Sequence, residues 1–267
     1  MALPPPSPDS TCLVTGASSG IGSEIARGLA ARGHGVTLIA RREDRLEDLA
    51  AELADEHGVR AEVVAADVSK VSQRKRLTKD VEELGLTVEV LVNNAGFGSG
   101  GRFATLDGEK EASMVRTNCE AVVALSNHYV TGMVERGRGA ILNLSSIASF
   151  QPIPFQATYG ATKAFVRSFT DALHEELRGT GVTATAVCPG PVRTEFGDQG
   201  GFGGDDDRIP GFMWISAEKV AEDALDAVEG GDRTVVPGAL NQLAAMYGHY
   251  LPRSVLLPIV RRVWPVS

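Results

Sequence analysis

The sequence predicts a doubly wound α/β fold, in which a seven-stranded, mostly parallel sheet lies between two layers of helices. Two observations predict this class. Apolar runs of strand length alternate along the chain with longer amphipathic segments of helix length. The runs are also nearly continuous in Val, Ile, Leu and Ala, which is typical of strands buried on both faces. Repeated strand–helix units of this kind form parallel sheets.

The seven expected strands are residues 11–15, 36–40, 61–66, 88–92, 140–144, 183–187 and 234–236. The expected helices are residues 20–32, 43–57, 70–84, 108–135, 158–178 and a segment running from its cap at Ser216 to about Val228. Helical spacing of apolar residues supports these assignments, as with Leu46, Leu49 and Leu53 in the second helix.

No linker divides this pattern, so we expect one domain at 10–237 between a disordered lead (1–9) and a C-terminal extension (238–267). The lead lacks both the basic region and the apolar region that a signal peptide contains. Residues 197–211 are rich in Gly and Asp, which predicts a mobile loop: either a disordered insertion or, as its place after the sixth strand favours, a lid. The extension is apolar and basic, and Pro252 and Pro258 should limit its helices.

Composition and charge limit the kinds of binding partner to be expected. The net charge of −8 makes nucleic acid an unexpected partner, and no apolar run reaches the length of a membrane span, so membrane association is not expected. Cys12, Cys119 and Cys188 have no metal-ligand spacing and are expected to be buried thiols in a reducing cytoplasm. We therefore expect no metal site.

A glycine-rich turn, Thr15–Gly22, joins the first strand to the first helix, with glycines at 16, 20 and 22. Glycines there let the backbone approach a pyrophosphate, and the helix N-terminus supplies N–H donors. The spacing departs from G-x-G-x-x-G, and an ordinary Gly/Ser turn is the alternative. We interpret the turn as a dinucleotide site.

The second strand ends at Arg41 and Arg42, where an NAD site usually has Asp or Glu. An arginine there accommodates a 2′-phosphate, so Arg41, supported by Arg42 and Ser18, favours NADP(H) over NAD(H). A solvated charge run is the alternative. Asp67-Val68 and Asn93-Asn94-Ala95-Gly96 close the third and fourth strands, where they can contact a ligand or simply form turns.

Tyr159 and Lys163 are four residues apart, so on a helix they share one face. A protonated lysine beside a phenol lowers the phenol's pKa and favours proton transfer to or from an alcohol or carbonyl. Ser146 lies 13 residues before Tyr159, at the end of an apolar run.

Together, in this order and spacing, the glycine-rich turn, Asp67, the Asn93–Gly96 tetrapeptide, Asn118, Ser146, Tyr159, Lys163 and Pro189-Gly190 resemble the short-chain dehydrogenase/reductase family over about residues 10–237, in its compact, single-domain Rossmann-fold branch. The resemblance implies that Tyr159 is the general acid/base, that Ser146 binds the substrate oxygen, that Lys163 binds the nicotinamide ribose and lowers the pKa of Tyr159, and that Asn118 positions a water. It also implies that the segment after Cys188 borders the nicotinamide. The cofactor-binding residues expected in all are Gly16, Ser18, Ser19, Gly20, Ile21, Gly22, Arg41, Arg42, Asp67, Val68, Asn94, Ala95, Gly96, Tyr159, Lys163, Pro189, Gly190, Val192 and Thr194.

The expected activity is NADP(H)-dependent interconversion of a carbonyl and a secondary alcohol. The alternatives are an NAD-dependent alcohol dehydrogenase of the same family and a dinucleotide-binding protein without turnover; a sugar-nucleotide epimerase would need more chain. A largely apolar small molecule is the expected substrate, with the pocket drawn from residues 147–155, 97–103 and 197–214 and the aromatic residues available being Phe150, Phe155, Phe196, Phe202, Phe212 and Trp214. A homodimer or homotetramer is expected, with the long helices or the apolar extension at the interface.

Overall fold

A computed structural model of the chain describes residues 3–200 and 211–263, without the side chains of residues 198–200 and 263. Seven strands form one parallel sheet in the order β3-β2-β1-β4-β5-β6-β7. They are β1 Ser10–Thr15, β2 Val36–Ala40, β3 Ala61–Ala65, β4 Thr87–Asn93, β5 Gly139–Leu144, β6 Val182–Val187 and β7 Thr234–Val235. The predicted doubly wound α/β class is confirmed.

Both faces of the sheet are buried, which explains the continuous apolar runs. In β1, Cys12 and Val14 belong to one apolar cluster and Leu13 to the other. Successive side chains of a strand point to opposite faces, so a strand covered on both sides needs apolar residues at every position.

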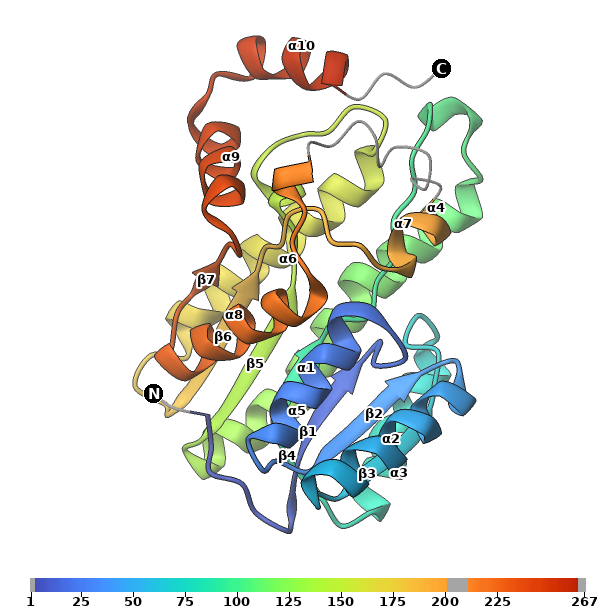
Figure 1. Cartoon of the computed structure of the whole chain (residues 1–267), viewed down its shortest axis with the longest axis vertical. Coiled ribbons are helices and arrows are strands. Elements are labelled where there is room, and N and C mark those ends of the chain that lie inside the picture. The colour runs from blue at the N-terminus through green and yellow to red at the C-terminus, as the bar shows by residue number, and fades with distance from the viewer. Residues whose placement is uncertain (1–2, 201–210, 264–267) are drawn as a thin grey trace.

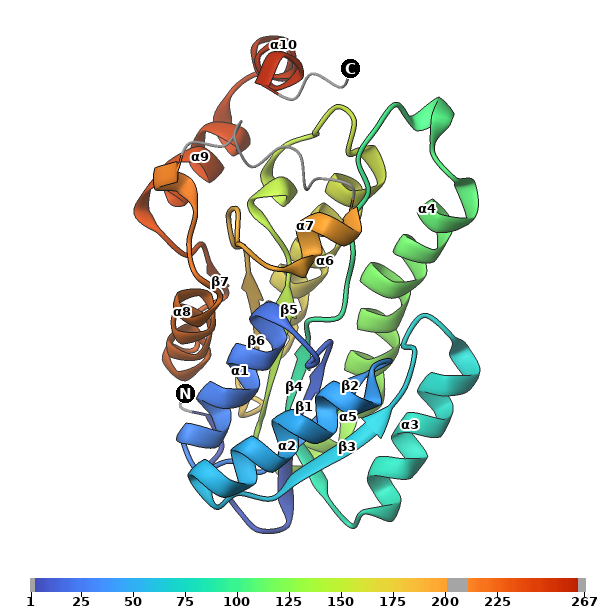
Figure 2. The ribbon, with the colours of Figure 1, turned by 45° about the vertical axis from the view of Figure 1, so that its right-hand side comes forward.

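Helices α1 (Gly20–Ala31), α2 (Glu43–His57) and α8 (Ala217–Gly230) cover the face that Figure 1 looks onto. Helices α3 (Val71–Glu83), α5 (Ala121–Arg136) and α6 (Ala157–Glu176) cover the other, as the turned view in Figure 2 shows. Leu46, Leu49 and Leu53 of α2 are buried as predicted.

The segment predicted as one helix over 108–135 contains a change of helical geometry. Helix α4 (Gly108–Val115) runs into a π-helical turn, η2 (Arg116–Glu120), before α5 begins. Such π turns occur often at functional sites because they change which side chains face a neighbour. This one contains Asn118, whose side chain is buried.

The region predicted as a mobile loop, 197–211, begins inside helix α7 (Glu195–Gly200) and ends at the 3₁₀ turn η5 (Gly211–Met213). The rest of that region lies outside the described residues, so the lid remains a prediction.

The extension forms helices α9 (Ala239–Tyr250) and α10 (Arg253–Val263). Pro252 separates them as predicted, but Pro258 lies within α10, so the prediction that it ends a helix is wrong. In Figure 1 both helices lie beyond one end of the sheet, the same end at which α7 is found. Leu256 and Val260 are buried against residues of the same chain, so part of the extension's apolar surface is satisfied without a second subunit.

At the other terminus, Leu3 packs against the core and Pro4 is buried, so these residues do not extend into solvent as a disordered lead would. No helix among residues 3–200 and 211–263 combines the length and apolar character needed to cross a bilayer.

Candidate active site

A cleft of about 780 Å³ lies at the carboxyl ends of the strands and extends to the tail helices. Its lining includes every site residue predicted from the sequence except Gly22 and Asn118. Those present are Gly16, Ser18, Ser19, Gly20, Ile21, Arg41, Arg42, Asp67, Val68, Asn94, Ala95, Gly96, Ser146, Tyr159, Lys163, Pro189, Gly190, Val192 and Thr194. Ligands of doubly wound sheets bind at this edge, because the loops after the strands converge there.

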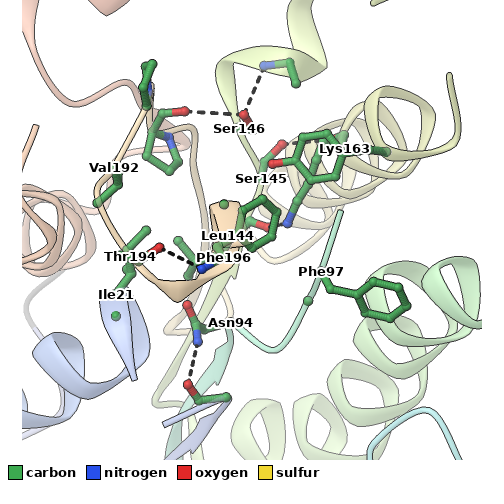
Figure 3. Close-up of a pocket in the computed structure, with 18 of the residues that line it drawn as sticks. Ile21, Asn94, Phe97, Leu144, Ser145, Ser146, Lys163, Val192, Thr194 and Phe196 are labelled. Atoms are coloured by element: carbon green, nitrogen blue, oxygen red, sulfur yellow. Dashed lines mark hydrogen bonds between the residues drawn. The ribbon is translucent and has the colours of Figure 1, made fainter. Parts of the chain in front are cut away.

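The turn after β1 is held by the turn after β4. Thr15 Oγ1 accepts hydrogen bonds from the backbone N–H groups of Asn94 (3.0 Å) and Ala95 (3.1 Å). Asn94 Nδ2 donates to the carbonyls of Thr15 (2.9 Å) and Gly16 (3.2 Å), as the close-up of the cleft in Figure 3 shows in part. Thr15 and Asn94 therefore fix the floor of the predicted dinucleotide site.

Gly22 lies beneath this floor rather than in the cleft. A Cβ on Gly22 would come within 2.3 Å of Asn94 Nδ2 and 2.4 Å of the Gly16 carbonyl oxygen. Only glycine therefore lets α1 start this close to the turn, with Gly16 and Gly20 at positive φ before it.

The N-terminus of α1 is open to an anion. The cap residue, Ser19, makes no capping hydrogen bond to the helix, and the first turn contains no acidic side chain. The first N–H groups of a helix have no intrahelical partner and attract negative charge. This cradle, built on glycines, fits a pyrophosphate.

Two arginines lie beside the cradle. Arg42 donates to Ser18 Oγ (3.0 Å) and Ser19 Oγ (2.9 Å), and Arg42 and Arg45 both donate to the carboxylate of Glu195, at 2.7 Å and 2.6 Å. These hydrogen bonds lower the pKa of Glu195 to about 2. Arg41, the residue that the sequence favoured, lines the cleft but is exposed, whereas Arg42 makes the contacts.

Asp67 closes β3 with its own turn. Ser69 donates to Asp67 Oδ1 through its backbone N–H (3.0 Å) and its hydroxyl (2.7 Å). Burial raises the pKa of Asp67, but these hydrogen bonds and the nearby charge of Arg41 outweigh burial and leave it below its usual value. The adjacent Val68 is buried and lines the cleft.

Ser146 and Tyr159 meet at the opposite end of the cleft. Ser146 follows β5 and caps the 3₁₀ turn η3 (Ile147–Phe150): its Oγ accepts from Ala148 N (3.1 Å) and donates to the Pro189 carbonyl (3.4 Å; Figure 3). Tyr159 is in the first turn of α6, packed against Phe196 with the ring centroids 5.6 Å apart.

Apolar surroundings raise the pKa of Tyr159 to about 12, although a hydrogen bond with Ser146 opposes this shift. The expectation that Lys163 lowers this pKa is therefore wrong for the structure described here. Lys163 Nζ lies 5.8 Å from the Tyr159 ring centroid and donates to the Leu144 carbonyl at 2.7 Å. Burial lowers the pKa of Lys163 to about 8.

Asn118 is set back from the cleft. Its Oδ1 accepts from Phe97 N (3.2 Å), and its Nδ2 donates to the Phe97 carbonyl (3.0 Å) and to Thr162 Oγ1 (3.1 Å). The π turn thus positions Asn118 to tie the segment after Gly96 to α6. A Cβ built on Gly96 would lie 3.0 Å from Asn118 Oδ1 and 3.7 Å from Lys163 Nζ, so this side chain and the lysine share a neighbourhood.

The segment after β6 carries Pro189, Gly190, Val192 and Thr194 along the cleft. A Cβ on Gly190 would come within 2.3 Å of the Asn241 side chain, so α9 presses directly against this segment. Asn241 Nδ2 also donates to the carbonyls of Pro237 (3.2 Å) and Met213 (3.4 Å). Sequence reasoning missed Asn241 because no local pattern relates α9 to a loop some 50 residues earlier.

The catalytic end of the cleft is apolar, but its aromatic lining differs in part from the prediction. Phe196 and Trp214 line it, Phe212 is 70% exposed, and Phe150 packs against His249 instead. Phe202 lies outside the described residues. Ile153 and Met213 come from the predicted segments 147–155 and 197–214. The rest of the wall comes from the C-terminal extension, which the sequence did not assign to the pocket, namely Ala244, Tyr247, Leu251, Leu256, Ile259 and Val260.

Comparisons with known proteins agree with this geometry. The family model described as short chain dehydrogenase matches residues 10–200. A Streptomyces coelicolor protein, whose name assigns it provisionally to the ketoacyl reductases, is 37% identical over 254 residues, covering 89% of this chain and 97% of that protein. A Sphingobium yanoikuyae short-chain dehydrogenase in complex with NADPH superposes with a TM-score of 0.80 at 32% identity, covering 90% of this chain and 92% of that one. A single-residue variant of the actinorhodin polyketide ketoreductase with NADPH gives 0.79 at 34% identity, covering 90% and 99%.

Proposed function

The chain belongs to the short chain dehydrogenase family of oxidoreductases, and we propose that it interconverts a carbonyl and a secondary alcohol with NADP(H). One observation carries this proposal: Ser146, Tyr159 and Lys163 converge at one end of a cleft whose other end offers a helix N-terminus and Arg42. A cleft of this kind suits an extended ligand with an anionic part at one end and a reactive part at the other.

The nicotinamide cofactor supplies a hydride or accepts one. The residues of the chain handle the proton. Tyr159 keeps its proton through the neutral range, because its raised pKa disfavours the phenolate, and it is therefore a donor to a carbonyl oxygen in the direction of reduction. Ser146 is hydrogen-bonded to Tyr159 and supports the same oxygen as negative charge develops on it.

Lys163 adds a buried cation at the end of the cleft that holds Ser146 and Tyr159. Its Nζ holds the Leu144 carbonyl, which fixes the ammonium below Tyr159 and close to Gly96. From there it can donate to the ribose hydroxyls and restore the proton that Tyr159 has given up. Asn118 acts as a positioning residue, since it holds the backbone of Phe97 against α6.

The preference for NADP(H) rests on Arg42 and Arg45. Two guanidinium groups that already share one carboxylate can bind a 2′-phosphate in the same way. Glu195 is also the observation that favours the alternative, an NAD-dependent alcohol dehydrogenase, because its charge offsets the arginines that a 2′-phosphate would need.

The substrate that fits best is largely apolar. Among the described lining residues, Lys163 is the only Arg, Lys, Asp or Glu between the Ser146 end and the tail helices. Apart from Lys163, the described part of the wall offers no cation for a carboxylate or phosphate on the substrate, and its aliphatic side chains favour hydrocarbon next to the reacting carbonyl.

The test is a panel of apolar ketones, aldehydes and secondary alcohols assayed with NADPH, NADH and their oxidised forms by absorbance of the reduced cofactor. The proposal expects turnover with at least one apolar ketone, and a higher kcat/KM for NADPH than for NADH. A preference for NADH would establish the alternative. Cofactor binding without turnover across a broad panel would contradict the assigned chemistry.

A further inference from the structure

Helices α9 and α10 expose an apolar surface to solvent. We call it the tail surface and define it by Leu240, Leu243, Met246, Tyr250, Val255 and Ile259. These side chains are between 44% and 77% exposed. This is a high concentration of large apolar groups for a face that no other described element covers.

The exposed residues of α9 in the tail surface recur at helical spacing. Leu243, Met246 and Tyr250 follow one another at intervals of three and four residues and share a face of α9. In α10, Leu256 and Val260 are buried, while Val255 and Ile259 are about half exposed. Helix α10 therefore presents apolar side chains both to the core and to solvent.

The charge of this region is opposite to that of the whole chain. Residues 239–263 contain Arg253, Arg261 and Arg262 and no Asp or Glu, in a protein of net charge −8. Arg253 is used internally, since it donates to the carbonyls of Gly248 (2.9 Å) and Phe150 (3.4 Å). Arg261 and Arg262 are exposed and form no ion pair with any of the described residues.

We propose that the tail surface docks on an anionic lipid bilayer, lying in the interface without crossing it. Apolar side chains flanked by arginines match such a surface, because the side chains enter the acyl boundary and the guanidinium groups reach the phosphates. Tyr250, the most exposed of the set, suits the boundary between headgroups and hydrocarbon.

A second copy of the chain fits this surface less well. In a two-fold interface the same patch meets itself, so the arginines of one copy would approach those of the other with no acidic residue of the tail between them. The sequence-based expectation against membrane association rested on the lack of an apolar run long enough to span a bilayer. Docking in the interface does not need such a run, and α10 continues through Pro258.

Docking would also place the cleft at the membrane. Tyr247 and Ile259 line the cleft and are at the same time more than half exposed, at 57% and 51%. The cleft therefore reaches the tail surface, and an apolar substrate dissolved in the bilayer could enter without crossing water. This inference goes beyond the proposed function and does not depend on turnover.

The test is co-sedimentation of the full chain with vesicles of phosphatidylcholine alone and of phosphatidylcholine with phosphatidylglycerol, at low and at physiological salt. We expect binding to the anionic vesicles that weakens with salt, and weaker binding to the neutral ones. Arg261→Gln with Arg262→Gln should reduce binding to anionic vesicles roughly tenfold or more, since each basic residue near the surface contributes about 1 kcal/mol. The matched control, Lys75→Gln with Lys79→Gln on α3, should leave it unchanged.

The apolar part is tested with Met246→Ser and Tyr250→Ser, against Val71→Ser, a comparably exposed apolar residue on α3. The first two should reduce binding to both vesicle types, and the control should not. Circular dichroism and thermal unfolding establish that every variant is folded. Absence of binding to anionic vesicles at low salt would overturn the proposal. So would a dimer that the Met246 and Tyr250 substitutions dissociate, because it would assign the surface to a second copy.

Discussion

Glu195 and Arg42 connect the two ends of the cleft. The carboxylate of Glu195, in the first turn of α7, accepts a hydrogen bond from Arg42 at 2.7 Å, and Arg45 donates to its other oxygen. Arg42 in turn holds Ser18 and Ser19 beside the start of α1. The segment that borders the catalytic end is thus tied through one carboxylate to the residues suited to a 2′-phosphate.

This contact predicts that Glu195 competes with the phosphate of NADP(H). Glu195→Gln removes the charge while keeping the size of the side chain, so we expect the Kd for NADPH to fall by roughly three- to tenfold, with little change for NADH. Fluorescence titration of both reduced cofactors measures it. Glu47→Gln, on the exposed part of α2, is the control. Equal changes for the two cofactors would show that Glu195 acts on the fold of α7 and not on the 2′ position.

Arg42 should matter more than Arg41 for cofactor choice. Arg42→Ala removes the group that contacts Ser18, Ser19 and Glu195, and we expect it to lower kcat/KM for NADPH by about 10- to 100-fold relative to NADH. Arg41→Ala should have a smaller effect, because Arg41 is exposed and acts on Asp67 only through its charge. The ratio of kcat/KM for the two cofactors is the measurement. A larger effect of Arg41→Ala would show that Arg41, the residue favoured by the sequence, is the one that binds the 2′-phosphate.

Tyr159→Phe should abolish most turnover while leaving the cofactor bound. The ring and its packing on Phe196 stay, and only the proton-transferring hydroxyl is lost. General acid/base groups contribute ~10²–10⁴-fold to the rate, so kcat should fall within this range while the Kd for NADPH stays constant. Tyr250→Phe removes an exposed phenol and serves as the control. A Tyr159 variant with near-normal kcat would exclude this residue as the proton donor.

The pH dependence of kcat/KM should reflect the ionisation of Lys163. Its pKa is lowered by burial to about 8, so its ammonium is lost as the pH rises through this value, whereas Tyr159 remains protonated. If the reaction needs the cation, kcat/KM for reduction is constant below about pH 8 and falls above it. In Lys163→Arg the guanidinium keeps its charge, so the fall should move to higher pH. The same fall at the same pH in the variant would mean that another group titrates.

Self-association should use α4 and α6. Phe165 and Phe169 of α6 stack with centroids 6.2 Å apart, and Phe165 is 44% exposed, as is Val115 at the end of α4. We expect sedimentation of the full chain to give a dimer or tetramer, and Phe165→Asp to shift it toward monomer. Val134→Asp, on the exposed side of α5, is the control. A full chain that sediments as a monomer at micromolar concentration would contradict the predicted oligomer.

Local patterns were sufficient for the sheet and for the first half of the cleft. The apolar runs of β1 and β5 can be recognised because burial on both faces leaves no alternation, and Gly16, Gly20 and Asn94 follow directly on such strands. The helix over 108–135 was predicted in place, but the π turn at Asn118 was not. Its extra residue per turn is stabilised by contacts with Phe97 and Thr162, which no short window of sequence contains.

The sequence by itself determined the order of strands and helices and the residues Ser146, Tyr159 and Lys163, because spacing along one chain fixes which of them share a helix or follow a strand. Only the tertiary structure decided that Glu195 pairs with Arg42, that Asn241 presses on Gly190, and that Leu256 and Val260 close the wall beside Tyr159. It also decided the pKa values, since burial, which raises that of Tyr159 and lowers that of Lys163, depends on what packs around a side chain and not on its neighbours in sequence.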